Sequence, residues 1–114
     1  MKNVTYEFTE ADVQAVIFCL KLIPYIDFQD TPPSQQFINA SLAASALQKL
    51  ENREISDITP NEVRMMSVAI DIAYMTIRNS CPYPISSEAN TNFAPYIFTI
   101  NKLYQSFSSQ LNEF

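Results

Sequence analysis

Apolar residues in segment 60–78 cover nearly the whole circumference of a helix. With successive residues placed about 100° apart around the axis, the polar side chains gather within an arc of roughly 60°: Arg64, Ser67, Asp71 and Arg78. A surface helix has a wide polar face, whereas a helix that is apolar on nearly all sides is buried on several of them. The pattern therefore predicts a central helix over 60–78 that the other helices cover.

The beginning of this central helix is marked by the sequence Thr59-Pro60-Asn61-Glu62. The Thr59 hydroxyl can accept a hydrogen bond from the amide of Glu62, and the Glu62 carboxylate can accept one from the amide of Thr59, which together make a capping box. Pro60 falls at the first helical position, where a missing N–H has no cost. These residues predict a helix that begins at Pro60.

We predict three further helices, over 10–23, 33–53 and 93–112. Thr9 and Asp12 repeat the capping-box pattern before the first of them, and Thr31 is the expected cap of the second. Four alanines in the second helix indicate close approach to a neighbouring helix. Its expected buried face consists of Ala40, Leu42, Ala43, Ala46, Leu47 and Leu50. The last helix is amphipathic, with an apolar stripe roughly 120° wide.

Four helices joined by short links and one longer loop, over 79–92, are typical of a four-helix bundle. The sequence therefore predicts an all-α fold with a single domain over 1–114, a length that can form its own core. Residues 1–8 alternate between apolar and polar side chains, as a strand does. Since no second strand is evident, we expect a short extended arm there.

The composition narrows the choice of partner and location. A net charge of −5 argues against nucleic-acid binding, which needs a basic face. The chain has no glycine, which argues against a glycine-rich phosphate loop. The first twelve residues lack the apolar core of a signal peptide, and the longest apolar run, 15–26, is short for a membrane span. We therefore expect a cytoplasmic location and no membrane association.

The residue types needed for most catalytic and metal sites are missing. The chain contains no histidine, so it cannot build a Ser-His-Asp or Cys-His site, nor the Glu-x-x-His motif of di-iron bundles. Its two cysteines, Cys19 and Cys81, form neither a zinc cluster nor a disulfide framework. We expect no enzymatic activity, no catalytic residue, no cofactor and no metal.

Surplus apolar surface provides the functional hypothesis. The first and central helices have only narrow polar stripes, so part of their apolar surface needs cover from a second copy, another protein or the long loop. We expect a small acidic protein-interaction or regulatory module, self-associating as a homodimer. The candidate contact residues are Phe18, Leu22, Tyr83 and Phe98.

The alternative hypothesis is a bundle that holds an apolar small molecule in its core. Methionine and aromatic side chains at helical spacing can line such a cavity. Asp71 or Arg64 would then be its buried polar anchor. An enclosed pocket of several hundred Å³ would distinguish this hypothesis from the protein-interaction module.

Overall fold

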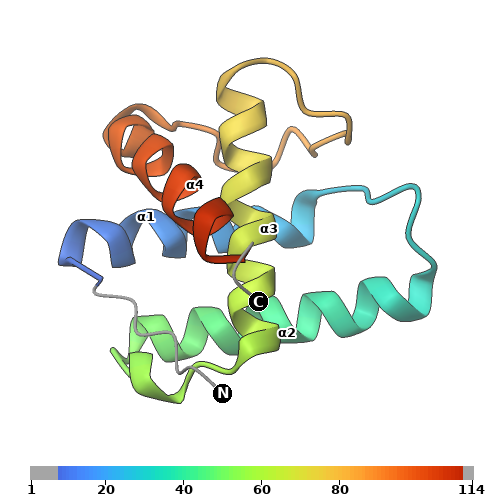
Figure 1. Cartoon of the computed structure of the whole chain (residues 1–114). Helices are drawn as coiled ribbons and strands as arrows, with labels where there is room; N and C mark the ends of the chain where they lie inside the picture. The colour runs from blue at the N-terminus through green and yellow to red at the C-terminus, as the bar shows by residue number, and fades with distance from the viewer. Residues whose placement is uncertain (1–7, 112–114) are drawn as a thin grey trace.

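The computed structural model describes residues 8–111, and their side chains as far as residue 106. Apart from Phe8, the predicted N-terminal arm lies outside the described residues. Four α-helices and three short 3-10 helices follow one another in the described part: α1 (Glu10–Leu20), η1 (Ile23–Tyr25), α2 (Pro33–Glu51), η2 (Ile55–Asp57), α3 (Pro60–Ile77), η3 (Ala94–Tyr96) and α4 (Ile97–Leu111). The predicted all-α four-helix bundle is confirmed (Figure 1).

The helix α3 is central, as its pattern predicts. It packs against α1, α2 and α4, which lie around it (Figure 1). Most of its length contributes to the core, where Met66, Ala69 and Ile70 are almost completely buried. One position of the expected polar stripe is wrong, because Ser67 is buried. Its side chain is small enough to fit between packed helices, whereas Arg64, Asp71 and Arg78 remain exposed.

Both predicted capping boxes are present. At the start of α3, the Thr59 amide donates to the Glu62 carboxylate at 2.8 Å, and the Glu62 amide donates to the Thr59 hydroxyl at 3.2 Å. Thr9 and Asp12 make the same pair of bonds at the start of α1, both at 3.1 Å. These bonds satisfy amides that have no partner within the helix.

The predicted cap of α2 is wrong. Pro32, and not Thr31, is the residue at the N-cap of α2, and no side chain caps this helix end. Instead, the Gln36 side chain donates to the carbonyl oxygens of Phe28 and Thr31, at 3.0 and 2.7 Å. The first turn of α2 is thus fastened to the preceding loop by a residue from within the helix.

Two helices end in a left-handed residue that is not glycine. Arg53 after α2 has φ 59°, and Asn79 after α3 has φ 61°. In both places the amide of the next residue donates a hydrogen bond to a carbonyl oxygen in the last turn of the helix. The Glu54 amide donates to Lys49 and the Ser80 amide to Met75, both at 2.8 Å. This is the Schellman arrangement, in which glycine is the usual residue at the left-handed position.

Replacing Asn79 by alanine should lower the free energy of unfolding by about 1 kcal/mol, because a Cβ without a local hydrogen-bonding group is strained in the left-handed region. Asn79→Gly should retain or increase stability. Asn52→Ala is the matched control, since Asn52 has an ordinary φ of −90°. Urea denaturation measures all three, and equal effects of alanine at positions 52 and 79 would contradict the argument.

The long loop between α3 and α4 is fastened to the segment after α1. Ile26 and Ile85 form an antiparallel bridge. It is flanked by hydrogen bonds from the Asp27 amide to the Pro84 carbonyl at 3.0 Å and from the Ser86 amide to the Tyr25 carbonyl at 2.9 Å. Side chains of this loop pack against the core: Cys81, Tyr83, Ile85 and Ala89. The loop therefore covers apolar surface that the helices leave open.

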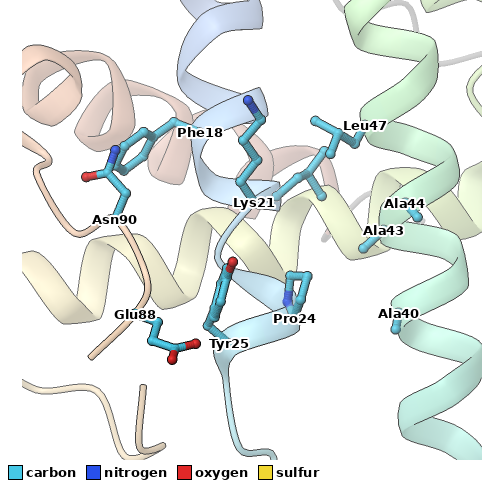
Figure 2. A pocket seen from close by; sticks show the side chains of 11 residues that line it. Phe18, Lys21, Pro24, Tyr25, Ala40, Ala43, Ala44, Leu47, Glu88 and Asn90 are labelled. Carbon is cyan, nitrogen blue, oxygen red and sulfur yellow. The ribbon is translucent and has the colours of Figure 1, made fainter. Parts of the chain in front are cut away.

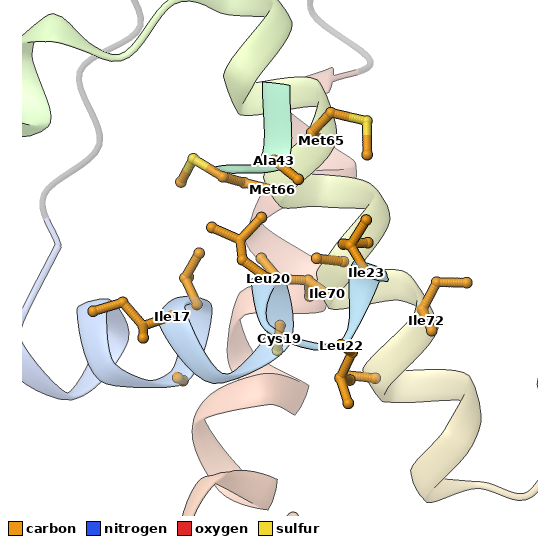
Figure 3. Packing of buried hydrophobic residues seen from close by; sticks show 14 of the residues in the cluster. Ile17, Cys19, Leu20, Leu22, Ile23, Ala43, Met65, Met66, Ile70 and Ile72 are labelled. Carbon is orange, nitrogen blue, oxygen red and sulfur yellow. The ribbon is translucent and has the colours of Figure 1, made fainter. Parts of the chain in front are cut away.

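The core is built mainly from α1, η1 and α3, with smaller contributions from α2 and α4. Leu20 and Ile23 from the first segment and Ile70 from α3 belong to one buried cluster (Figure 3). Helix α1 ends at Leu20, earlier than predicted, and the chain turns through η1, in which Pro24 lies near the start. Within residues 8–111, no helix combines the length and the apolar character needed to cross a membrane.

Candidate functional site

The outward side of α2 carries no charge as far as Gln48. The uncharged stretch runs from Thr31 to Gln48, although 17% of the chain is charged. Ala43, Ala46 and Leu50 turn inward and are buried. The opposite side forms a ridge of exposed residues at spacings of four, three and four: Phe37, Ser41, Ala44 and Gln48. We call this ridge the α2 ridge.

Two large apolar side chains lie on this exposed side of α2. The Phe37 side chain is 74% exposed and that of Ile38 is 50% exposed. Large apolar side chains are usually covered, and a single exposed one needs no explanation. Two adjacent ones on an uncharged helix surface, however, form a patch, which is typical of an interaction site.

An apolar groove runs along α2 beside the α2 ridge. Two hollows, of about 410 and about 310 Å³, share Pro24 and Ala40 in their walls. They lie between α2 and the α1–η1 segment, and we call them together the α2 groove. One wall is formed by alanines and Leu47 of α2, and the facing wall includes Pro24 and Tyr25 (Figure 2).

The charged groups of the α2 groove are confined to its rim. Lys21 from the end of α1 and Glu88 from the long loop both line the larger hollow (Figure 2). Both residues are exposed, so water solvates their charges. The floor offers methyl groups and aromatic edges, and no pair of groups arranged for acid–base chemistry. The groove is therefore suited to binding apolar side chains.

An internal network holds α2 against α3. The Lys49 ammonium lies 2.7 Å from the Glu62 carboxylate, and the Ser45 hydroxyl donates to the other oxygen of that carboxylate. Burial alone would raise the pKa of Glu62, but the bonds from Lys49, Ser45 and Thr59 outweigh it and lower the pKa to about 2. Glu62 thus serves both as the cap of α3 and as the anchor of α2.

Asp12 has the same double role at the start of α1. Its carboxylate caps α1 and lies 2.8 Å from the ammonium of Lys102 on α4. Burial opposes the ionisation of Asp12, but Lys102 and the Thr9 amide outweigh it, so the pKa lies below its usual value. The two capping acids therefore fix the helices that carry the exposed surfaces.

The four predicted contact residues differ in burial and in surroundings. Leu22 is buried at 2% exposure, so its prediction as a contact residue is wrong. Phe18 is half-buried and packs against Phe93 and Tyr96, with ring centroids 5.4 and 4.8 Å away, although it still lines the α2 groove. The segment around η3 thus covers part of the first helix.

Tyr83 and Phe98 have different surroundings. Tyr83 is half-buried in the long loop, where its ring centroid lies 5.1 Å from that of Phe28. Phe98 on α4 is 83% exposed, and the exposure predicted for it is confirmed. It is neighboured by Ile97, which is 40% exposed although the sequence pattern places it on the buried stripe. Neither Tyr83 nor Phe98 lines the α2 groove.

The expected buried polar anchors are both exposed. Arg64 and Asp71 lie on the outer side of α3, and neither lines the α2 groove. The prediction of a buried anchor is therefore wrong, because the narrow polar stripe of α3 faces solvent. Partial shielding from water raises the pKa of the Asp71 carboxyl. Nearby, the Arg78 guanidinium donates to the Tyr74 hydroxyl at 2.9 Å, and the ring of Tyr74 stacks on that of Tyr104.

The α2 surface was missed by the sequence argument. Ala40 is exposed in the α2 groove, whereas the helical pattern assigns it to the buried face. Phe37 and Ile38 were not singled out, although the uncharged stretch that contains them is visible in the sequence. The absence of charge from Thr31 to Gln48 is the sequence signal that points to this surface.

Among the described residues, no group of three His, Cys, Asp or Glu side chains is arranged to hold a metal ion. The α2 groove with its ridge is the candidate site, on the exposure and lining described above. Comparisons with protein-family models, with curated proteins and with solved structures found no match to this chain.

Proposed function

We propose that this chain is a protein-interaction module that binds through the α2 groove and the α2 ridge. The observation that carries the proposal is the 74% exposure of Phe37 at the edge of an apolar groove, within the uncharged stretch from Thr31 to Gln48. The centre of a protein interface is typically apolar, rich in aromatic residues and depleted of charge. The α2 groove has a mostly apolar lining with aromatic side chains in its walls, and the stretch beside it from Thr31 to Gln48 is uncharged.

The framework behind this surface supports the same conclusion. Helix α2 is anchored by Glu62 and by three buried residues on its inner side. A rigid helix loses little conformational entropy when a partner binds, so more of the contact energy contributes to affinity. The α2 ridge is thus a preorganised surface.

Photo-crosslinking in the cells that produce the protein tests the proposal. A benzophenone side chain introduced at Ser41, on the α2 ridge, should yield covalent adducts with protein. The matched control is the same side chain at Gln105, an exposed polar position on α4. Adducts that are equally frequent at both positions, or absent at Ser41, would overturn the proposal.

A second candidate function is the binding of an apolar small molecule in the α2 groove. The volume of the larger hollow, about 410 Å³, falls in the range of small-molecule sites. The hollow lies at the surface, however, and not inside the core as an enclosed ligand site would. A native mass spectrum distinguishes the two candidates, because a copurified small molecule adds its mass to the single chain.

A further inference from the structure

We infer that the occupant of the α2 ridge is a second copy of this chain, with the two α2 helices packed antiparallel across a two-fold axis. This inference rests on the proposed function and names the partner. Its support comes from the distribution of charge on the molecule and from the order of residue sizes along the ridge.

The charge argument concerns repulsion between identical acidic molecules. Each chain carries a net charge of −5. The described ion pairs, formed by Lys49, Arg53 and Lys102, leave seven described carboxylates outside them: Asp27, Asp30, Glu51, Glu54, Asp57, Asp71 and Glu88. Two copies that met through surfaces with these groups would bring like charges together. The α2 ridge avoids that cost, because no charged residue lies between Thr31 and Gln48.

The same observation disfavours an unlike partner recognised by charge. Specific partners of opposite charge are selected through complementary charged groups. The α2 ridge offers none, so it provides no ionic discrimination between partners. A neutral surface on a strongly acidic molecule is suited to meeting an identical neutral surface.

The order of residue sizes fits a two-fold arrangement. Along the α2 ridge, the large residues Phe37 and Gln48 lie at the two ends, and the small residues Ser41 and Ala44 lie between them. In an antiparallel pair centred between 41 and 44, Phe37 faces Gln48 of the second copy, and Ser41 faces its Ala44. Small residues at the centre allow the helix axes to approach closely, and each contact occurs twice, as an isologous interface requires.

The antiparallel direction also avoids contacts between like residues. A parallel pair would place Phe37 against Phe37 and Gln48 against Gln48. Antiparallel helices also align their dipoles favourably.

Sedimentation velocity over roughly 1 to 200 µM measures the association. One helix pair lies at the small end of stable interface sizes, so we expect a micromolar dimer that dissociates on dilution. Phe37→Glu should weaken the dimer at least tenfold, because it removes the aromatic side chain of the ridge and brings two carboxylates into the interface, each facing an uncharged Gln48. Phe98→Glu, on another exposed aromatic residue, is the matched control and should leave association unchanged.

A charge-pair variant tests the antiparallel register. In the double variant Phe37→Glu/Gln48→Lys, the carboxylate introduced at position 37 faces the ammonium introduced at position 48 of the second copy. It should therefore recover most of the association lost in Phe37→Glu, while circular dichroism remains that of the unmodified chain. Failure of the double variant to associate better than Phe37→Glu would overturn the antiparallel arrangement.

Failure of this inference can be told apart from failure of the proposed function. A chain that stays monomeric at 200 µM but forms adducts from Ser41 with other proteins would overturn the homodimer and retain the interaction module. A monomer without any protein adduct from Ser41 would overturn both. A dimer that Phe98→Glu disrupts and Phe37→Glu does not would place self-association on α4 and overturn the inference.

Discussion

Replacing Glu62 by alanine should lower the free energy of unfolding by about 3 kcal/mol at neutral pH. The Glu62 carboxylate is buried, and its pKa falls from an ordinary value of 4.5 to about 2. That difference measures how much more strongly the folded protein stabilises the ionised form. The variant loses the cap of α3 together with the anchor of α2, and it leaves Lys49 without its carboxylate.

This effect should depend on pH in a defined direction. Because the folded pKa of Glu62 is lower than the unfolded one, its contribution is complete above about pH 4.5. It is lost progressively as the pH falls from about 4.5 to about 2. Urea denaturation of the unmodified chain and of Glu62→Ala should therefore give a difference at pH 7 that nearly disappears near pH 2.

Glu10→Ala provides the matched control for the Glu62 experiment. Glu10 is also a carboxylate in the first turn of a helix and is paired with Arg53, but both partners are exposed. Exposed ion pairs contribute little to stability, because water screens them. A loss for Glu10→Ala as large as that for Glu62→Ala, or a pH-independent loss at position 62, would contradict the argument.

Replacing Ile70 by alanine should lower the free energy of unfolding by about 3 kcal/mol as well. Ile70 is 1% exposed and lies in the centre of the core, where α3 meets α1 (Figure 3). The shorter side chain removes buried methyl groups and leaves a cavity, since packed helices relax only partly around it. Thermal and urea denaturation both measure the loss.

Phe98→Ala is the control for the core substitution. It removes more atoms than Ile70→Ala, but Phe98 is 83% exposed, so stability should change by less than about 0.5 kcal/mol. Comparable losses at positions 70 and 98 would show that α4 is covered at Phe98. Phe98 would then not be exposed in the folded protein.

The core and the Glu62 network together position the exposed side of α2. The core fixes α3 between the other helices, and the Glu62 network attaches α2 to it at Ser45 and Lys49. The α2 ridge lies on the exposed side of the same helix, opposite its buried residues Ala43, Ala46 and Leu50. A substitution at Glu62 should therefore loosen the position of α2, whereas a substitution at Phe37 should change binding and leave the fold intact.

The starts of α1 and α3 were determined by the sequence itself. A capping box needs two residues three positions apart, and all of its hydrogen bonds are local. Thr9 with Asp12 and Thr59 with Glu62 could therefore be recognised without a structure. The central place of α3 was equally readable, because a helix that is apolar on nearly all sides requires neighbours on several sides.

Only the tertiary structure decided which apolar residues remain uncovered. Leu22 is buried, and Phe18 is half-covered by Phe93 and Tyr96, which are far from it in the chain. Phe37 and Ile38 remain exposed, because α2 turns Ala43, Ala46 and Leu50 toward the core. Helical periodicity shows that a face exists, but coverage depends on non-local packing, and so does the location of the candidate site.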